Sequence, residues 1–398
     1  MANPSAPVEL VGPLWIEDVV RIVRGARATL SENVLRRVDA ARQVVAAAVE
    51  AGSVVYGVTT GFVGLANVRL APDHSTALQQ GLLRSHAVAV DNELSAEEVR
   101  AMLALRAHDL ALGHSGSDAR SCCGSSRCSR ETFPPVVPEQ GSLGASGDLA
   151  PLAHLALPVI GEGEVGLAGE RLPAIGALHR CGLEPMVLEA KEGLALINDT
   201  QGMTAIGALA AWRATRLAKI ADISAALTIE AILGTDRAFD PRVVGLRQHP
   251  GQLASARNLV RLLTGSDILS SHRERDQIVQ DSYSIRCAPQ VHGAFRDVVR
   301  HGVQTLEIEL AWISERRLFW LLDPKTSNGL PAFLVGEAGV NSGFMVCQYT
   351  AASLVSEMKN LAHPAAIAMK VLAEPRLATY EPLCWPDRAA GRPSRRSA

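Results

Sequence analysis

Residues 204–233 read TAIGALAAWRATRLAKIADISAALTIEAIL, and this stretch indicates the fold more clearly than any other. Its apolar residues recur three or four positions apart: Ile206, Ala210, Ala214, Leu217, Ile220, Ile223, Leu227 and Ala231. On an α-helix this spacing brings the apolar side chains to one side. The stretch therefore predicts one long helix with a long buried face.

The same spacing recurs along the chain. Residues 17–49 predict two amphipathic helices, and residues 344–372 are helical in character with few turn residues. Residues 301–322 begin with this periodicity and slip out of step after Ile313. Alternation typical of strands is scarce, and only residues 161–172 predict a small hairpin. We therefore expect an all-α fold built on long packed helices.

The composition excludes several classes of protein. Hydrophobic residues make up 47% of the 398 positions and charged residues 20%, which is enough for a large core. A net charge of -2 gives no electrostatic reason to expect nucleic acid or an acidic membrane as partner. No apolar run has the length of a membrane span, and no signal peptide is evident, so we expect a cytoplasmic protein. Seven cysteines argue against a disulfide framework, and Cys122, Cys123 and Cys128 fit no zinc spacing, so no metal is expected.

Residues 141–154 read GSLGASGDLAPLAH and contain the tripeptide Ala145-Ser146-Gly147. In a tight turn the Gly147 nitrogen can reach the carbonyl carbon of Ala145. Loss of water from that ring and from the Ser146 side chain would then leave an exocyclic methylidene, which is a strong electrophile. Glycine suits the attacking position because a Cβ would crowd the backbone. The structural alternative is an ordinary turn with Asp148 as the N-cap of a helix.

Three further motifs carry polar side chains, and each also has a structural interpretation. Tyr56 lies in the glycine-punctuated turn YGVTTGF, where it could be a base or could pack on the core. His86 in RSHA follows a helical pattern, where a lone histidine is more often structural. Asn198 follows an apolar run and could cap a helix or donate a hydrogen bond into a site.

The motif QDSYSIR at residues 280–286 is denser. On a helix Tyr283 and Arg286 share a face because they are three residues apart. An arginine fork can hold a substrate carboxylate through two parallel hydrogen bonds. The alternative is a capped helix with a solvated arginine.

Taken together, these motifs resemble one family. In the order YGVTTGF, RSHA, GSLGASGDLAPLAH, KEGLALIN and QDSYSIRCAPQVHG they resemble the aromatic amino acid ammonia-lyases, and most closely those that act on histidine. NSGFM at 341–345 and His363-Pro364 follow in the same order, so that the resemblance extends from about residue 8 to residue 363.

The resemblance implies an architecture and a prosthetic group. It implies the all-α, long-helix fold of the ammonia-lyase and fumarase type, with a mixed N-terminal part at 1–203 and a helix bundle at 204–373. The residues after 373 end in DRAAGRPSRRSA, and this composition predicts a disordered tail at 374–398. It implies that Ala145, Ser146 and Gly147 form a 4-methylidene-imidazol-5-one (MIO) group, with no external cofactor. It also implies a homotetramer in which several subunits build each active site.

The resemblance further implies roles for single residues. Tyr56 would remove the β-proton of the substrate, and His86 would contact the substrate side chain. Arg286 would bind the carboxylate. Three more residues would surround the electrophile: Asn198, Gln280 and Tyr283. The implied reaction is elimination of ammonia from L-histidine to give trans-urocanate in histidine catabolism, with a phenylalanine or tyrosine ammonia-lyase or an aminomutase as alternatives.

The chain also departs from the family. Leu310 joins Ala311 directly, where the family has a further segment that carries a phenylalanine of the site. A later glutamate-bearing motif of the histidine enzymes has no counterpart here, and the aberrant Cys-rich segment 114–131 replaces an apolar helix. Asp199 stands where the family favours glycine, and it would be strained if that position required a positive φ. These departures suggest truncation and internal deletion. The alternative hypothesis is therefore that the chain is a catalytically defective remnant of such an enzyme.

Overall fold

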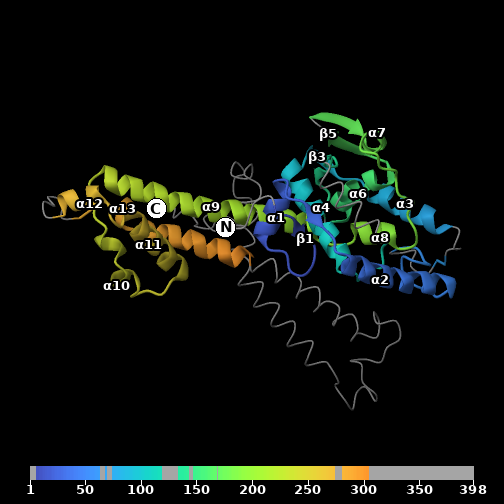
Figure 1. Ribbon diagram of the computed structural model, residues 1–398, viewed down its shortest axis with the longest axis horizontal. Helices are drawn as coiled ribbons and strands as arrows, with labels where there is room; N and C mark the ends of the chain where they lie inside the picture. Colours follow the sequence, from blue (N-terminus) through green and yellow to red (C-terminus); the bar gives the residue numbers. More distant parts are fainter. Residues whose placement is uncertain are drawn as a thin grey trace, which may run out of the picture. The chain divides into compact units, whose positions relative to one another are not determined.

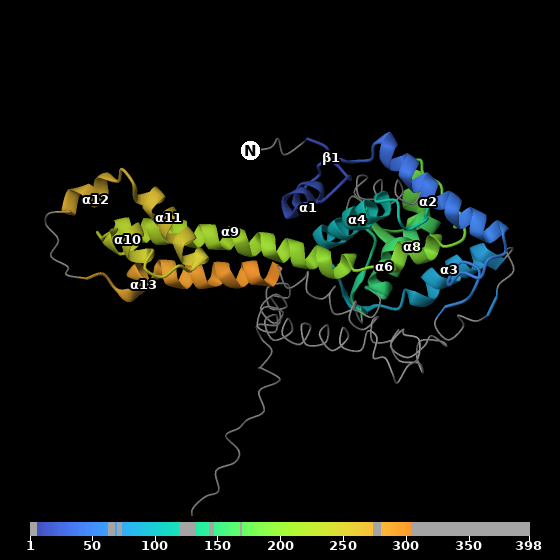
Figure 2. The same ribbon diagram turned by 90° about the horizontal axis from the view of Figure 1, so that it is seen from below.

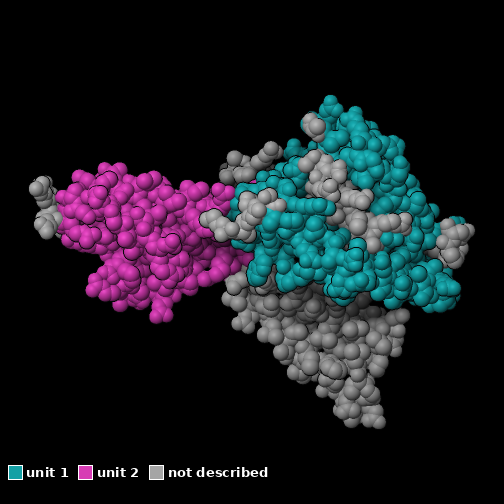
Figure 3. Space-filling model, viewed as in Figure 1, with its two compact units in different colours: residues 1–212 teal, residues 213–398 magenta. Residues whose placement is uncertain are grey.

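The computed structural model describes residues 6–62, 68–69, 74–118, 133–142, 147–167, 169–273 and 280–303. The chain forms two compact units, residues 1–212 and 213–398, and the division falls inside the long helix α9 (Gln201–Ala231) (Figure 3). The sequence-based boundary at 203/204 stays a prediction. The predicted tail at 374–398, the helix at 344–372, most of the segment 114–131 and all but the first three residues of the stretch 301–322 lie outside the described residues.

The first unit is mostly helical, as predicted, with short strands between the helices (Figures 1 and 2). Its helices are α1 (Ile16–Val23), α2 (Glu32–Glu50), α3 (Ser75–His86), α4 (Ala96–Ala111), α6 (Leu149–Ala156), the 3-10 turn η3 (Leu157–Ile160), α7 (Ala174–Arg180), α8 (Glu192–Ile197) and the first part of α9. The two helices predicted within residues 17–49 are thus confirmed as α1 and α2.

Helix α4 is the centre of this unit's core. It begins at a capping box, in which Ser95 accepts a hydrogen bond from the Glu98 amide and Glu98 accepts one from the Ser95 amide. Its middle is buried on almost every side, with Ala101, Met102 and Leu103 all at most 2% exposed. Helices α1 and α2 pack on α4, while α3, α6 and α8 pack on one another. Most of the buried apolar side chains of the unit form one continuous cluster.

The strands of the first unit form three two-stranded pairs within the described residues. The hairpin predicted for residues 161–172 is confirmed as β5 (Glu164–Leu167) and β6 (Glu170–Pro173), paired antiparallel. The other pairs were not expected, because strands this short leave no alternation to detect. They are β1 (Val8–Glu9) with β2 (Ala28–Thr29), parallel, and β3 (Val90–Glu93) with β4 (Pro138–Gln140), antiparallel.

The second unit contains the rest of α9 and the segments that pack on it. These are the 3-10 turn η4 (Arg237–Phe239), α10 (Pro241–Val244), α11 (Pro250–Leu263), α12 (Asp267–His272), α13 (Tyr283–Arg286) and a helical stretch at 288–303. Figure 2 shows α9 beside the helix that follows α13. At one contact Gly251 and Gly293 meet so closely that a Cβ added to Gly293 would overlap the Gln252 main chain.

Helix α9 is long, as predicted, but its buried face differs from the expected one. Leu217, Ile220, Ile223 and Leu227 are 46 to 63% exposed in the single chain. Ala210 and Ala214 of the predicted face are buried, but beyond them the buried residues of α9 lie on another side and include Ala218, Ala226 and Ile229. Periodicity identifies an apolar stripe, but it does not tell a stripe that packs within the chain from one that the chain leaves exposed.

The packed side of α9 also buries a carboxylate. Asp222 is 1% exposed and accepts hydrogen bonds from four side chains. The donor-to-oxygen distances are 2.6 Å from Ser255, 2.9 Å from Asn258, 2.9 Å from His292 and 2.6 Å from Arg296. Burial alone would raise the pKa of Asp222, but the hydrogen bonds and the Arg296 charge bring it below its ordinary value. This charged network ties α9 to α11 and to the 288–303 helix.

Candidate functional site

The end of the Ala-Ser-Gly loop packs directly on the chain between α8 and α9. Ala145 and Ser146 lie outside the described residues, and Gly147 lies within them. Gly147 has φ +121°, a conformation that L-residues rarely adopt. A Cβ on Gly147 would overlap the Asp199 carbonyl oxygen and would lie 2.8 Å from the Asp199 nitrogen. Only glycine fits this position without a shift of the Asp199 main chain.

Asp148 holds the same turn from the N-cap position of α6. It precedes α6, yet its side chain makes no capping bond to that helix. Its amide donates to the Asp199 carbonyl oxygen at 2.7 Å. Its buried carboxylate accepts from the Met203 amide at 2.8 Å and from the Ser142 hydroxyl at 2.5 Å. Asp148 thus stands at the N-cap position of α6, as the structural alternative expected, but its carboxylate binds the first turn of α9 and not the α6 amides.

Asp199 is the main-chain support of this turn. Residues with positive φ among the described non-glycine positions are Asp91, Lys191 and Leu233. The strain considered for Asp199 is therefore absent. The Asp199 carboxylate accepts from the Thr200 amide at 2.8 Å and from the Gln201 side chain at 2.7 Å. These bonds hold the short link between α8 and α9.

A buried arginine binds the Asp199 carboxylate from α4. Arg106 of α4 is 3% exposed and donates to Asp199 at 3.2 Å, to Gln201 at 2.9 Å and to Asp109 at 2.6 Å. Sequence reasoning missed Arg106, although a charged residue in the apolar run of α4 was a usable signal, since buried charges are paired. Burial raises the pKa of Asp109, and the Asp199 charge adds to the rise, against the charge of Arg106.

The Tyr56 turn is tied to α8 through a buried glutamine. Gln79 of α3 is fully buried; it donates to the Gly57 carbonyl oxygen at 3.2 Å and accepts from the Leu194 amide at 3.1 Å. Tyr56 itself is 51% exposed, and its ring meets the edge of Phe62 at a centroid distance of 5.9 Å. Gln79 had no signal in the sequence, because a glutamine on a helix is usually solvated.

His86 is the last residue of α3 and is half-buried. Its Nδ1 lies 2.9 Å from the Leu82 carbonyl oxygen. The Ser85 hydroxyl lies 3.1 Å from the same nitrogen. A carbonyl oxygen only accepts, so the bond to Leu82 requires the proton on Nδ1, the tautomer in which Nε2 is an acceptor. Next to His86, Arg84 forms a two-pronged ion pair with Glu162, which links α3 to the turn after η3.

Three of the predicted site residues in the first unit lie on, or are bound to, helices α3 and α8. The Tyr56 turn is bound through Gln79, His86 ends α3, and Asn198 is the C-cap of α8. Asn198 immediately precedes Asp199, on which Gly147 packs. The structure therefore brings Asn198 next to the described end of the Ala-Ser-Gly loop.

The other three predicted residues belong to the second unit. Tyr283 and Arg286 lie at the two ends of the single turn α13, as the spacing predicts, with Tyr283 72% exposed and Arg286 half-buried. Gln280 is exposed just before them. Asp281, between Gln280 and Tyr283, is buried and accepts from the Thr235 amide at 2.8 Å. This bond fixes the motif to the turn that follows α9.

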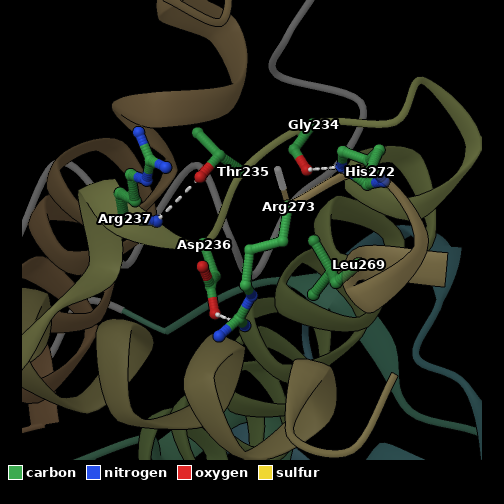
Figure 4. Close-up of a pocket in the computed structure, with 7 residues that line it drawn as sticks. All are labelled: Gly234, Thr235, Asp236, Arg237, Leu269, His272 and Arg273. Carbon is green, nitrogen blue, oxygen red and sulfur yellow. Dashed lines mark hydrogen bonds and ion pairs between the residues drawn. The ribbon is translucent and has the colours of Figure 1, made fainter. Parts of the chain in front are cut away.

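The described part of the second unit also contains a small pocket of about 140 Å³, lined by Gly234, Thr235, Asp236, Arg237, Leu269, His272 and Arg273 (Figure 4). Figure 4 shows Arg273 turned toward Asp236, with which it pairs at 3.3 Å, and His272 bound to the Gly234 carbonyl oxygen. Ligand pockets usually measure about 300–1,000 Å³. None of the predicted site residues lines this pocket, so we do not assign it to the site.

Among the helices that the structure describes, none is long and apolar enough to cross a membrane. The family model for aromatic amino acid lyases matches residues 14–312 and 308–374. The two matched stretches overlap at 308–312, a range that includes the Leu310–Ala311 junction.

Relatives and solved structures agree with this match. The chain is 46% identical to the histidine ammonia-lyase of Symbiobacterium thermophilum over 402 residues, covering 90% of this chain and 79% of that protein. The tyrosine aminomutase of Streptomyces globisporus has a TM-score of 0.70 at 30% identity, covering 92% of this chain and 85% of that one. The histidine ammonia-lyase of Trypanosoma cruzi has a TM-score of 0.64 at 34% identity, covering 89% and 74%. The predicted fold class is thereby confirmed, and the chain belongs to the aromatic amino acid lyase family.

Proposed function

We propose that this chain is a histidine ammonia-lyase, which converts L-histidine to trans-urocanate and ammonia. The observation that carries the proposal is the Gly147 turn, with φ +121° and no room for a Cβ, in a chain of the aromatic amino acid lyase family. The choice of histidine is supported by the 46% identity to the Symbiobacterium enzyme over most of the chain.

The proposal includes an MIO group built from Ala145, Ser146 and Gly147, with no external cofactor. The described residues fit such a group, because ring closure needs an unhindered Gly147 nitrogen in a sharply bent turn. The Asp199 carbonyl and the Asp148 amide hold that turn with a 2.7 Å hydrogen bond. The group supplies an electrophile that makes the amino group of the substrate a better leaving group.

Residues of the first unit would take the proton and recognise the side chain. Tyr56, on its exposed turn, would accept the β-proton as the C–N bond breaks and the Cα–Cβ double bond forms. His86, with its proton on Nδ1, would offer Nε2 to the imidazole N–H of the substrate. Asn198, beside the Gly147 turn, would donate a hydrogen bond toward the reacting atoms.

Residues of the second unit would hold the other end of the substrate. Arg286 would bind the carboxylate through two parallel hydrogen bonds, and Gln280 and Tyr283 would line the site next to it. A homotetramer in which different subunits supply the two sets of residues is part of the proposal. The exposed apolar stripe of α9, formed by Leu217, Ile220, Ile223 and Leu227, supports this assembly. A cytoplasmic location stays a prediction.

One observation favours a second candidate, an aminomutase that acts on an aromatic amino acid. The tyrosine aminomutase of Streptomyces globisporus has the higher TM-score, 0.70 against 0.64 for the histidine ammonia-lyase of Trypanosoma cruzi. An aminomutase returns the amino group to the β-carbon, so its product has the mass of its substrate. A lyase releases ammonia instead.

The experiment is a substrate panel with the purified chain. The chain is incubated separately with L-histidine, L-tyrosine and L-phenylalanine. The products are then separated by chromatography and identified by mass spectrometry. We expect urocanate and an equal amount of ammonia from L-histidine, both absent from Ser146→Ala. A β-amino acid formed from tyrosine would favour the aminomutase. Folded tetramer that yields no product from any of the three would favour the defective remnant.

A further inference from the structure

The link between α8 and α9 supports the reactive loop, and a chain-specific residue stands at its centre. Asp199 accepts the Asp148 amide through its main chain, and Gly147 packs against its carbonyl and its nitrogen. On its main-chain side, the Gly147–Asp148 turn is therefore held against the Asp199 peptide, while the Asp148 carboxylate binds the Met203 amide and Ser142. Whatever fixes Asp199 thus contributes to fixing that turn.

The side chain of Asp199 is anchored from three directions. Its carboxylate accepts from the Thr200 amide and from Gln201 within its own segment. From α4, in the middle of the core, Arg106 reaches it at 3.2 Å. Arg106 is 3% exposed, so its charge is desolvated and must be matched by the carboxylates around it. A rigid helix thus determines where the Asp199 peptide lies.

Asp109 completes the arrangement. It is one turn from Arg106 on α4 and accepts from it at 2.6 Å. Because Arg106 donates to both carboxylates, its pairing with Asp109 holds the guanidinium in the place from which it reaches Asp199.

We infer that Asp199 is a positioning residue for the electrophile: its side chain, held by Arg106, which Asp109 in turn holds, helps to fix the main-chain support on which the Gly147–Asp148 turn is built. The inference rests on the proposed function, because it concerns the loop that forms the MIO group. It differs from a purely structural ion pair, which would stabilise the α4–α9 contact without changing the turn.

Two readouts separate these possibilities. The first is the rate at which newly made chains lose two water molecules, followed by intact-mass spectrometry during cell-free synthesis. The second is amide hydrogen exchange in the peptide that contains the Asp148 amide. The variants are Asp199→Ala, which removes the anchor, and Asp199→Asn, which keeps an acceptor and the volume. Glu164→Gln is the matched control, because it removes an exposed carboxylate that pairs with Arg171 on the β5–β6 hairpin.

We expect Asp199→Ala to slow water loss about tenfold or more, because a displacement of about 1 Å in a reacting geometry can cost on the order of 100-fold. Exchange at Asp148 should rise by a similar factor, and Asp199→Asn should recover most of both effects. Arg106→Met should act like Asp199→Ala, and the double variant should be no slower than either single one, since both remove the same anchor. Glu164→Gln should match the wild type.

Unchanged Asp148 exchange in folded Asp199→Ala would overturn the inference, and so would water loss at the wild-type rate. Wild-type chains that never lose water would instead overturn the proposed function. In that case Asp148 exchange still decides whether Asp199 positions the turn. Circular dichroism of each variant verifies folding, and Asp199→Asn carries the test if Asp199→Ala does not fold.

Discussion

The contact between Gly147 and Asp199 can be tested by adding one methyl group. In Gly147→Ala the new Cβ would overlap the Asp199 carbonyl oxygen and would lie 2.7 Å from the Asp199 carbonyl carbon. Real Cβ atoms do not approach main-chain atoms this closely, so either the turn or the α8–α9 link has to move. Both movements would break the 2.7 Å bond from the Asp148 amide to the Asp199 carbonyl oxygen.

The chain contains a matched control for this change. Gly25 has φ +101°, close to the +121° of Gly147, but nothing lies within 4 Å of a Cβ added there. Both alanine variants carry backbone strain of about 1–3 kcal/mol. Only Gly147→Ala adds the cost of overpacking, which is about 1–3 kcal/mol more. For a unit of this size each kcal/mol corresponds to about 2–4 °C, so Gly147→Ala should melt roughly 2–12 °C below Gly25→Ala.

The assay is thermal unfolding of both variants, followed by circular dichroism at one protein concentration. The same samples are weighed to determine whether two water molecules have been lost. We expect Gly25→Ala to have lost the mass of two water molecules and Gly147→Ala to keep its full sequence mass. The reasoning is refuted if Gly147→Ala has the same melting temperature as Gly25→Ala and has also lost two water molecules, because the loop would then not require the tight packing on Asp199.

Two further predictions concern buried polar side chains. Asp222→Ala should destabilise the second unit by about 3–5 kcal/mol in urea unfolding, because it leaves the Arg296 charge buried without its partner. Since the pKa of Asp222 is lowered in the folded chain, its contribution is present above pH about 4 and is lost as the pH falls through the lowered pKa. Asp222→Asn should therefore remove part of the acid-side loss of stability; identical urea midpoints at pH 3 and pH 7 in the wild type would contradict this. Gln79→Ala should free the Tyr56 turn by leaving two buried main-chain groups unpaired, at about 1–3 kcal/mol each, and chymotrypsin cleavage after Tyr56 should become faster. Cleavage at the wild-type rate would show that Gln79 does not hold the turn.

Much of the helical architecture could be predicted, because long periodic segments carry a strong signal. Helices α1, α2, α3 and α9 and the β5–β6 hairpin lie where the pattern places them. The short strands β1 to β4 could not be found, since two to four residues leave no period to measure. The packed side of α9 was predicted only in its first part, at Ala210 and Ala214, because farther along the helix Ala218, the buried Asp222 and Ile229 form it while the larger residues from Leu217 to Leu227 lie outside.

The site could be predicted in part. The motifs indicated Tyr56, His86 and Asn198, and the structure connects their segments through α3 and α8. The supporting residues could not be found in this way, because their importance depends on burial. Gln79 and Arg106 are at most 3% exposed, and each binds a segment far away in the sequence. Backbone strain was expected at Asp199 only if its φ were positive, and its φ is not positive. What distinguishes Asp199 is its side chain, which binds Arg106 and Gln201.

The most direct test of the central claim is the mass of the peptide that contains Ala145, Ser146 and Gly147, cut from the purified wild-type chain. We predict that this peptide weighs less than its sequence by two water molecules, and that the same peptide from Ser146→Ala lacks this deficit. A wild-type peptide at its full sequence mass, from protein shown to be folded, would contradict the claim that this chain builds its own electrophile.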